Sequence, residues 1–170
     1  MTTLRPRLPD RHVGRGHARP RRRGQLGMCM AAIAFTTVGV SMAPLAVADS
    51  TDSLRAAVAA ARGTACGPLR SNPVVDQAAE AVNGTTDKWI NNASRADPET
   101  DALSVLKDLG YGGSKAAILS GAAGNDGDAI KAALLQGYAK IPDCSYADFG
   151  VSALYNAKKD LILTTVILAA

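Results

Sequence analysis

The C-terminal segment, DFGVSALYNAKKDLILTTVIL, constrains the fold more than any other part of the chain. From Phe149 to Tyr155, larger apolar side chains alternate with smaller or polar ones, as in a strand with one buried face. Residues 156–159 supply a turn, and a continuous apolar run follows at 161–168, which is typical of a strand covered on both faces. This run is too short to cross a bilayer as a helix. We therefore expect a β-hairpin whose second strand lies inside a sandwich.

The elements before the hairpin are mostly helical. Asn72 and Pro73 favour a helix N-terminus. Helices are predicted at 50–62, at 73–82 with an extension to 90 after a break near Gly84, from Asp97 or Thr100 to Leu109, and from Asp126 or Asp128 to Gln136, with a short strand at 116–120. Helices in this order must cover a small sheet on both faces. The predicted fold class is α/β (α+β), a three-layer α-β-α sandwich with a small sheet that ends in the C-terminal β-hairpin.

The first 48 residues have the organisation of an export signal. Eight of the 19 basic residues and one of the 15 acidic residues precede residue 25, so the chain from Asp49 onward carries 11 basic and 14 acidic residues. An apolar run follows the basic segment, and Ala46 and Ala48 form an A-x-A cleavage site before Asp49. We expect a basic leader with a signal peptide at 1–48 and an exported domain at 49–170. Two alternatives stay open: an uncleaved membrane anchor, and a nucleic-acid-binding arm followed by a buried helix.

Cysteine use agrees with export. Cys29 would leave with the leader, and the remaining pair, Cys66 and Cys144, is an even number in an oxidising compartment. A disulfide between them would close a loop of nearly eighty residues, and the chain-entropy model gives such a loop about 4 kcal/mol of stabilisation. The alternative is two buried free thiols. We expect the disulfide if the domain is exported.

A glycine-rich stretch, AILSGAAGNDGDAIKAALLQ, places Gly121, Gly124 and Gly127 between an apolar run and a helix-like segment. Strand, loop and helix in this order can also cradle a phosphate group. The spacing matches neither a dinucleotide-binding motif nor a P-loop, and Asp126 and Asp128 would repel a phosphate from the start of the helix. We therefore predict a turn at this stretch and not a nucleotide site.

The residue types of the exported domain limit its chemistry. Both histidines, His12 and His17, lie in the leader, which excludes histidine-dependent nucleophiles and histidine metal ligands from the domain. Its acidic pairs are expected to cap helices rather than bind a cation. Trp89 and the four tyrosines are expected in the core or at its edge, with a ligand groove as the alternative. We expect no cofactor and no metal.

Four stretches of the exported domain carry a family resemblance. They are CGPLRSNPVVDQAAEAV, LGYGGSKAAILSGAAG, DAIKAALLQ, and YADFGVSALYN followed by LILTTVILA. In this order they resemble the start of the second helix, the Gly-Tyr … Gly-Glu-Asn-Ile-Ala-x-Gly segment, the His-Arg-x-Asn-Ile-Leu helix and the closing hairpin of one domain family. That family is the SCP-like domain of the CAP superfamily (cysteine-rich secretory, antigen and pathogenesis-related proteins), in its bacterial extracellular form. The likeness covers most of 51–170.

The departures from that family concern its cavity. Members often hold two histidines and two acidic residues there, able to bind a divalent metal. Here the family's Glu-Asn pair falls on about Ala116 and Ala117, and its next histidine falls near Ile130 or Lys131. Because the tetrad is absent, the resemblance assigns no catalytic or metal residue to this chain. We expect a cavity without those ligands, with the glycine stretch at its rim.

The predicted function is that of a secreted, non-enzymatic, disulfide-bonded binding domain. The resemblance implies a small apolar or lipid ligand, and the other expected partner is a protein at the cell surface. We expect no nucleic acid, and a membrane only through an uncleaved leader. A cavity lined by Leu and Val without convergent polar groups would favour a lipid. One alternative is a hydrolase of unfamiliar type, favoured if Ser120 or Ser114 lies beside Asp126 in a concave pocket. The other is a structural or membrane-anchored envelope protein.

Overall fold

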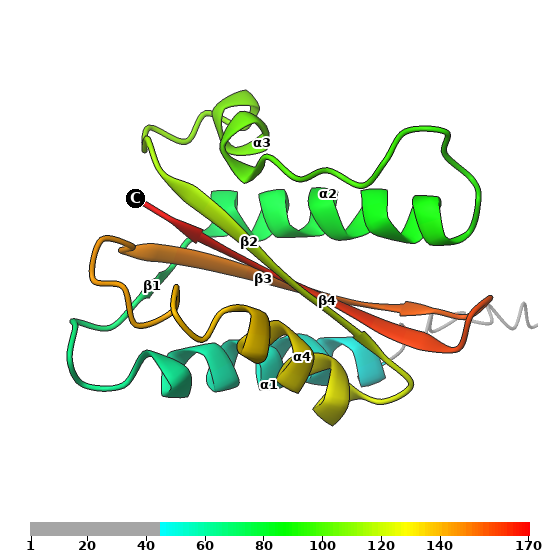
Figure 1. Cartoon of the computed structure of the whole chain (residues 1–170), viewed down its shortest axis with the longest axis horizontal. Helices are drawn as coiled ribbons and strands as arrows, with labels where there is room; N and C mark the ends of the chain where they lie inside the picture. Colours follow the sequence, from blue (N-terminus) through cyan, green and yellow to red (C-terminus); the bar gives the residue numbers. More distant parts are fainter. Residues whose placement is uncertain (1–44) are drawn as a thin grey trace, which may run out of the picture. The chain divides into compact units, whose positions relative to one another are not determined.

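The computed structural model describes residues 45–170, which are drawn in colour in Figure 1. The basic and apolar parts of the predicted leader, residues 1–44, lie outside the described residues. The predicted cleavage site at Ala46, Ala48 and Asp49 falls in the first turns of helix α1 (Leu45–Arg62). Removal of residues 1–48 would therefore shorten α1 at its N-terminus. None of the helices in the described part of the chain is long and apolar enough to cross a membrane.

One four-stranded sheet, with the strand order β1-β3-β4-β2, runs through the described residues. Its strands are β1 (Arg70–Ser71), β2 (Ala116–Ala123), β3 (Asp148–Asn156) and β4 (Leu161–Ala169). β3 and β4 form the predicted antiparallel hairpin, with Asn156 opposite Leu161 at the turn. β2 pairs antiparallel with the other side of β4, and β1, which the sequence did not predict, pairs parallel with β3. β2 is therefore an edge strand.

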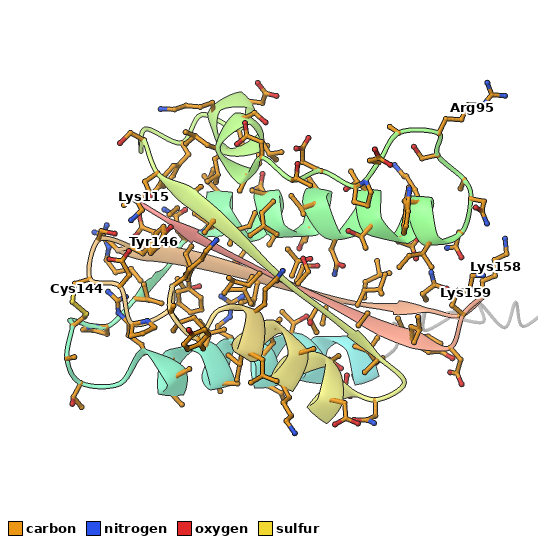
Figure 2. The ribbon with its side chains drawn as sticks, viewed as in Figure 1. Arg95, Lys115, Cys144, Tyr146, Lys158 and Lys159 are labelled. Atoms are coloured by element: carbon orange, nitrogen blue, oxygen red, sulfur yellow. A yellow bond between two sulfur atoms is a disulfide. The ribbon has the colours of Figure 1, made fainter. Side chains whose placement is uncertain are left out.

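Helices cover both faces of this sheet. Figure 1 shows α1 and α4 (Asp126–Gln136) on one face, and α2 (Pro73–Ile90) and α3 (Ala102–Asp108) on the opposite face. The predicted three-layer α-β-α sandwich is confirmed. Side chains fill the space between the sheet and the helices on both sides (Figure 2).

β4 contributes side chains to both halves of the core, as its apolar sequence predicts. Neighbouring side chains of a strand point to opposite faces. Val166 and Leu168 accordingly belong to the apolar cluster under α1 and α4, whereas Ile167 and Ala169 belong to the cluster under α2 and α3. All four are buried. The apolar run that constrained the predicted fold most therefore lies in the central layer of the sandwich, covered on both faces.

The helix N-termini confirm one predicted cap and correct another. Asn72 caps α2, and its side chain accepts a hydrogen bond from the backbone nitrogen of Val74 at 3.0 Å. α3 is capped by Asp101, not by Asp97 or Thr100 as predicted. Asp and Thr are both good capping residues, so the sequence alone did not distinguish these neighbours.

α2 lies unusually close to the sheet at Gly150. A Cβ atom there would be 2.2 Å from the carbonyl carbon of Val75 and 2.3 Å from the nitrogen of Asp76, so only glycine fits. The Asp76 carboxylate accepts a hydrogen bond from the backbone nitrogen of Val151 at 2.8 Å and pairs with Arg55 at 3.1 Å. These contacts fix the N-terminal end of α2 against β3.

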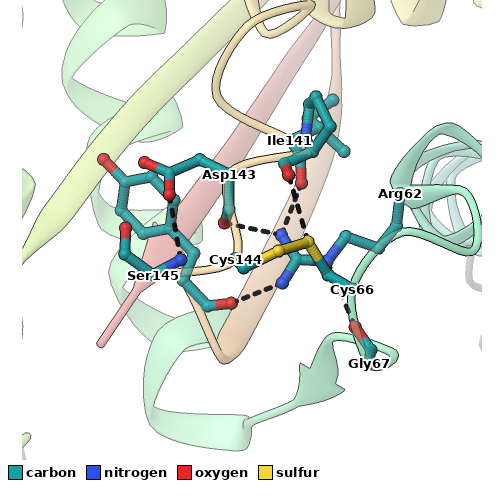
Figure 3. Close-up of a disulfide and its surroundings, with 9 residues drawn as sticks. Arg62, Cys66, Gly67, Ile141, Asp143, Cys144 and Ser145 are labelled. Atoms are coloured by element: carbon teal, nitrogen blue, oxygen red, sulfur yellow. Dashed lines mark hydrogen bonds between the residues drawn. A yellow bond between two sulfur atoms is a disulfide. The ribbon is translucent and has the colours of Figure 1, made fainter.

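A disulfide joins Cys66 and Cys144, as predicted, and links segments separated by 78 residues. The Cα atoms of the two cysteines are 5.3 Å apart (Figure 3). The bond connects the loop after α1 with the loop before β3. It therefore ties one outer layer of the sandwich to the start of the central hairpin.

Arg62 lies beside the disulfide at the end of α1 and is only 4% exposed (Figure 3). Its guanidinium donates hydrogen bonds to four backbone carbonyl oxygens. The acceptors are Gly67 at 3.2 Å, Ile141 at 2.6 Å, Asp143 at 2.8 Å and Tyr146 at 2.8 Å. A guanidinium carries five N–H donors in a fixed plane, which suits it to hold several carbonyls at once. Nothing in the sequence indicated this role.

Candidate functional site

A cavity of about 390 Å³ opens beside the edge strand β2, on the face of the sheet that α2 and α3 cover. Its walls come from the last turns of α2, the loop between α2 and α3, β2, and the last residue of α4. The lining residues are Thr86, Trp89, Pro98, Glu99, Thr100, Ile118, Ser120 and Gln136. Concave sites of this size are the usual location of small-molecule binding.

A second hollow, of about 220 Å³, adjoins the first and shares Thr86 and Ser120 with it. Polar side chains of α2 and β4, including Asn83 and Thr165, also line it. Asn83 is buried and donates hydrogen bonds from Nδ2 to Ser152 Oγ and to the carbonyl of Leu163, both at 3.1 Å. The walls of this second hollow are therefore held by contacts between α2 and the sheet.

Trp89 forms an aromatic wall of the larger cavity. It is the only tryptophan in the chain, and 48% of it is exposed. The prediction that aromatic residues lie in the core or at its edge is confirmed for Tyr146, which is buried, and wrong for Tyr138, which is 80% exposed. For Trp89 the structure favours the alternative, a position in a ligand groove.

The loop that closes one side of the cavity is held in place by side chains. Thr85 donates a hydrogen bond to the carbonyl of Val82 at 2.7 Å and accepts one from the backbone nitrogen of Glu99 at 3.0 Å. The Glu99 carboxylate accepts hydrogen bonds from the nitrogens of Thr100 and Asp101 at 2.8 and 2.7 Å. Glu99 and Asp101 thus order the start of α3, in keeping with the predicted capping role for acidic residues.

Gln136 closes the cavity from the other layer of the sandwich. Its side-chain oxygen accepts a hydrogen bond from the backbone nitrogen of Ser120. Because β2 is an edge strand, every second N–H along it points away from β4 and needs another partner. Gln136 provides one in the middle of the strand, so the end of α4 becomes part of the site.

The charge of the cavity is set by one residue. Of the described residues that line it, Glu99 alone has a charged side chain, and the other polar groups are the hydroxyls of Thr86, Thr100 and Ser120 and the amide of Gln136. The site therefore offers neutral hydrogen-bonding groups, one carboxylate and an aromatic surface.

The glycine stretch forms the predicted turn. β2 ends at Ala123, Asn125 caps α4 by accepting a hydrogen bond from the nitrogen of Asp128 at 2.9 Å, and α4 begins at Asp126. The predicted capping residues, Asp126 and Asp128, lie in the first turn instead. Gly121 belongs to β2, where a Cβ would be 2.1 Å from the carbonyl oxygen of Ala129. This glycine thus lets α4 pack against the strand.

The predicted hydrolase arrangement does not form in the described residues. Ser120 lines the cavity, but Asp126 and Ser114 do not. Asp126 accepts a hydrogen bond from Ser50 of α1 at 2.6 Å, in the layer on the opposite face of the sheet. The backbone nitrogen of Ser114 bonds to the carbonyl of Ala170 at 2.7 Å. The three side chains therefore do not converge.

A serine that the sequence analysis missed, Ser145, contacts the amine of Lys115. Lys115 also pairs with Asp143 at 3.0 Å and lies 4.2 Å from the centre of the Tyr146 ring. The carboxylate and the ring both bind the Lys115 ammonium as a cation, and an ammonium cannot accept a proton from a serine. Hydrogen bonds from the Ser145 backbone and side chain, and from Lys115, lower the pKa of Asp143 to about 2. This cluster is an ion pair beside the disulfide, not a nucleophile with its base.

The surroundings of Tyr111 raise the pKa of its hydroxyl. Burial, a 2.8 Å hydrogen bond from its hydroxyl to Asp148, and the charge of that carboxylate together raise the pKa of Tyr111 to about 12. Asp148 is itself buried and pairs with Arg70 at 2.9 Å. The loop after α3 is thereby joined to the start of β3.

This contact predicts a pH dependence of stability. The folded protein holds the Tyr111 proton more tightly than the unfolded chain, whose tyrosines titrate near 10. The contribution to stability is therefore complete below pH 10 and is lost as the pH rises towards 12. We expect Tyr111→Phe to unfold at lower denaturant than the parent at pH 8 and to show a flatter decline in unfolding free energy between pH 10 and 11. Equal slopes for the two proteins would contradict this assignment.

The described residues have an SCP-like fold, as the resemblance implied. An outer surface protein from Borrelia burgdorferi matches with a TM-score of 0.57 at 11% identity, over 71% of this chain and 92% of that chain. A cysteine-rich secretory protein from Staphylococcus aureus matches with a TM-score of 0.54 at 16% identity, over 75% of this chain and 40% of the other. No protein-family model matches the sequence, and a comparison with curated proteins finds no match.

The family's tetrad positions lie apart from the cavity. Ala116 and Ala117 begin β2, and Ile130 and Lys131 lie in α4, but none of the four lines the cavity. Among residues 45–170, no three His, Cys, Asp or Glu side chains are close enough together to hold a metal ion. The candidate site is therefore built from Trp89, Glu99, Ser120 and Gln136 and their neighbours, a set that local spacing in the sequence did not indicate.

Proposed function

We propose that residues 49–170 form a non-enzymatic extracellular binding domain that holds a small ligand in the cavity beside β2. The observation that carries the proposal is the half-exposed Trp89 in a cavity of about 390 Å³ with convergent polar side chains. A large aromatic side chain is normally covered in a folded domain, and its exposure in a concave site is typical of recognition.

The extracellular location is supported by the order of basic, apolar and small residues before Asp49. It is also supported by the Cys66–Cys144 disulfide, because such bonds persist in oxidising compartments. The two proteins of similar fold are described as an outer surface protein and a secretory protein.

The non-enzymatic assignment rests on the surroundings of Ser120. None of the described residues that line the cavity carries an imidazole or amine that could accept its proton. The Glu99 carboxylate already accepts two backbone hydrogen bonds at the start of α3. The polar groups of the cavity are therefore suited to hold a ligand.

Trp89 provides a direct test, because all tryptophan emission of the protein comes from this residue. The protein recovered from culture medium is titrated with three trisaccharides (of glucose, mannose and N-acetylglucosamine), with oleate, and with choline. We expect at least one of these probes to shift or quench Trp89 emission in a saturable way. Failure of every probe to change the emission would contradict the proposed function.

Two matched variants locate the binding. Ser120→Leu fills the cavity and is expected to abolish the response, with its folding checked by circular dichroism. Ser53→Leu introduces the same side chain at an exposed position of α1, in the layer on the opposite face of the sheet, and is expected to bind like the parent. An equal response in both variants would place the binding elsewhere.

A further inference from the structure

We infer that the ligand of this cavity is a short, uncharged saccharide. This inference rests on the proposed function and specifies its ligand class. It follows from three properties of the site: the exposed aromatic wall, the kind of hydrogen-bonding groups and the charge.

The aromatic wall suits the ring of a sugar. Trp89 presents a large, rigid surface, of which nearly half is exposed beside the cavity. The face of an aromatic ring is electron-rich, and the C–H groups on one face of a pyranose ring carry partial positive charge. A sugar can therefore stack on the indole with its apolar face and keep its hydroxyls at the periphery.

The groups around Trp89 suit those hydroxyls. Thr100 and Ser120 carry hydroxyls that can donate and accept at once, as a sugar hydroxyl does. The Thr86 hydroxyl, which donates to the carbonyl of Val82 at 3.3 Å, can still accept. The side-chain oxygen of Gln136 accepts a hydrogen bond from the backbone of β2, and its amide nitrogen carries two N–H donors that can bind a ligand. An alkyl chain would displace water from the Thr100 and Ser120 hydroxyls and from the Gln136 amide nitrogen without replacing its hydrogen bonds, at a cost in free energy. The described wall also contains Ile118 and Pro98, but none of the Leu and Val side chains that would favour a lipid.

The charge of the lining argues against the other common classes of small ligand. Glu99 is the charged residue among the described residues of the wall, and no lysine or arginine accompanies it there. A fatty-acid carboxylate or a phosphate would be repelled. A quaternary ammonium would be attracted to Glu99 and Trp89, but sites for such cations surround them with several aromatic rings, whereas the described residues of this wall provide one.

The adjoining hollow extends the site beyond a single ring. It continues from Thr86 and Ser120 and adds room for a ligand, whereas Asn83 and Thr165 in its wall are buried and the Asn83 amide already donates to Ser152 and Leu163. The two adjoining hollows share Thr86 and Ser120 and together have room for two or three linked sugar units, with Trp89 at one end.

The affinity is measured by calorimetry, because variants of Trp89 lose the tryptophan emission that the fluorescence titration needs. We expect one of the three trisaccharides to bind the parent, with an affinity that is unchanged between 50 and 500 mM salt, as expected for a neutral ligand. Trp89→Ala is expected to weaken binding about tenfold or more, and Trp89→Phe, which keeps an aromatic face, is expected to weaken it less. Gln136→Leu is expected to weaken it as well, and Ser53→Leu is expected to leave it unchanged.

The outcomes separate this inference from the proposed function. If oleate or choline binds and none of the trisaccharides does, the saccharide inference is overturned, while the proposed function of the cavity as a binding site stands. Choline binding would further be weakened by salt and by Glu99→Gln, whereas saccharide binding would not depend on salt. Equal affinities of Trp89→Ala and the parent for a trisaccharide would also overturn the inference, because the sugar would then lie elsewhere.

Discussion

Replacing Arg62 with alanine is expected to lower the free energy of unfolding by about 3 kcal/mol or more. The side chain is almost completely buried, and its guanidinium holds four backbone carbonyl oxygens. Each buried acceptor that loses its donor costs about 1–3 kcal/mol. Three of the four carbonyls belong to the segment before β3, so this segment is expected to loosen first.

Arg70 provides the matched control for this substitution. Its side chain is 73% exposed, and its buried partner Asp148 keeps the hydrogen bond from Tyr111 when Arg70 is removed. A guanidinium that is mostly in water contributes on the order of 1 kcal/mol to an ion pair. Arg70→Ala is therefore expected to be much less destabilising than Arg62→Ala in urea denaturation with the disulfide intact. Arg62→Lys is expected to lie between them, because an ammonium has three donors and no planar fork. Similar midpoints for the two alanine variants would show that the four hydrogen bonds are not a major source of stability.

The hairpin and the layered architecture could be predicted because their signal is local. The uncharged apolar run of β4 requires cover on both faces, and the helices before it supply that cover. Gly84 was expected to interrupt α2, yet the helix continues through it to Ile90. A glycine in a helix costs about 1 kcal/mol, and the burial of Ala79 and Val82 against the sheet outweighs this cost.

The candidate site could not be predicted in the same way, because its residues come from four separate elements. In the sequence, Gln136 looked like the last residue of an amphipathic helix. Its hydrogen bond to the backbone of Ser120 depends on the edge position of β2, which the sequence does not reveal. Arg62 looked like an ordinary basic residue at a helix C-terminus. Its partners at 141–146 lie about eighty residues away in the chain. Sequence reasoning recognises the spacing of residues within one helix or strand. These contacts join residues from different elements, so no spacing pattern indicates them.

The disulfide is expected to stabilise the domain by about 4 kcal/mol, through the loop of 78 residues that it closes in the unfolded chain. A variant with Cys66→Ser and Cys144→Ser should therefore unfold at a much lower urea concentration than the parent. A reductant should shift the parent to the midpoint of this double variant and leave the double variant unchanged. A parent that reductant does not affect would contradict the bond.

The slope of the denaturation curve separates the disulfide from Arg62, although both connect the end of α1 to the segment before β3. Loss of the cross-link lets the unfolded chain expand, so more surface becomes exposed on unfolding and the dependence on denaturant steepens. Loss of Arg62 removes contacts of the folded state, so its midpoint falls while the slope stays that of the parent. A steeper curve for Arg62→Ala would instead mean that Arg62 also keeps the unfolded chain compact.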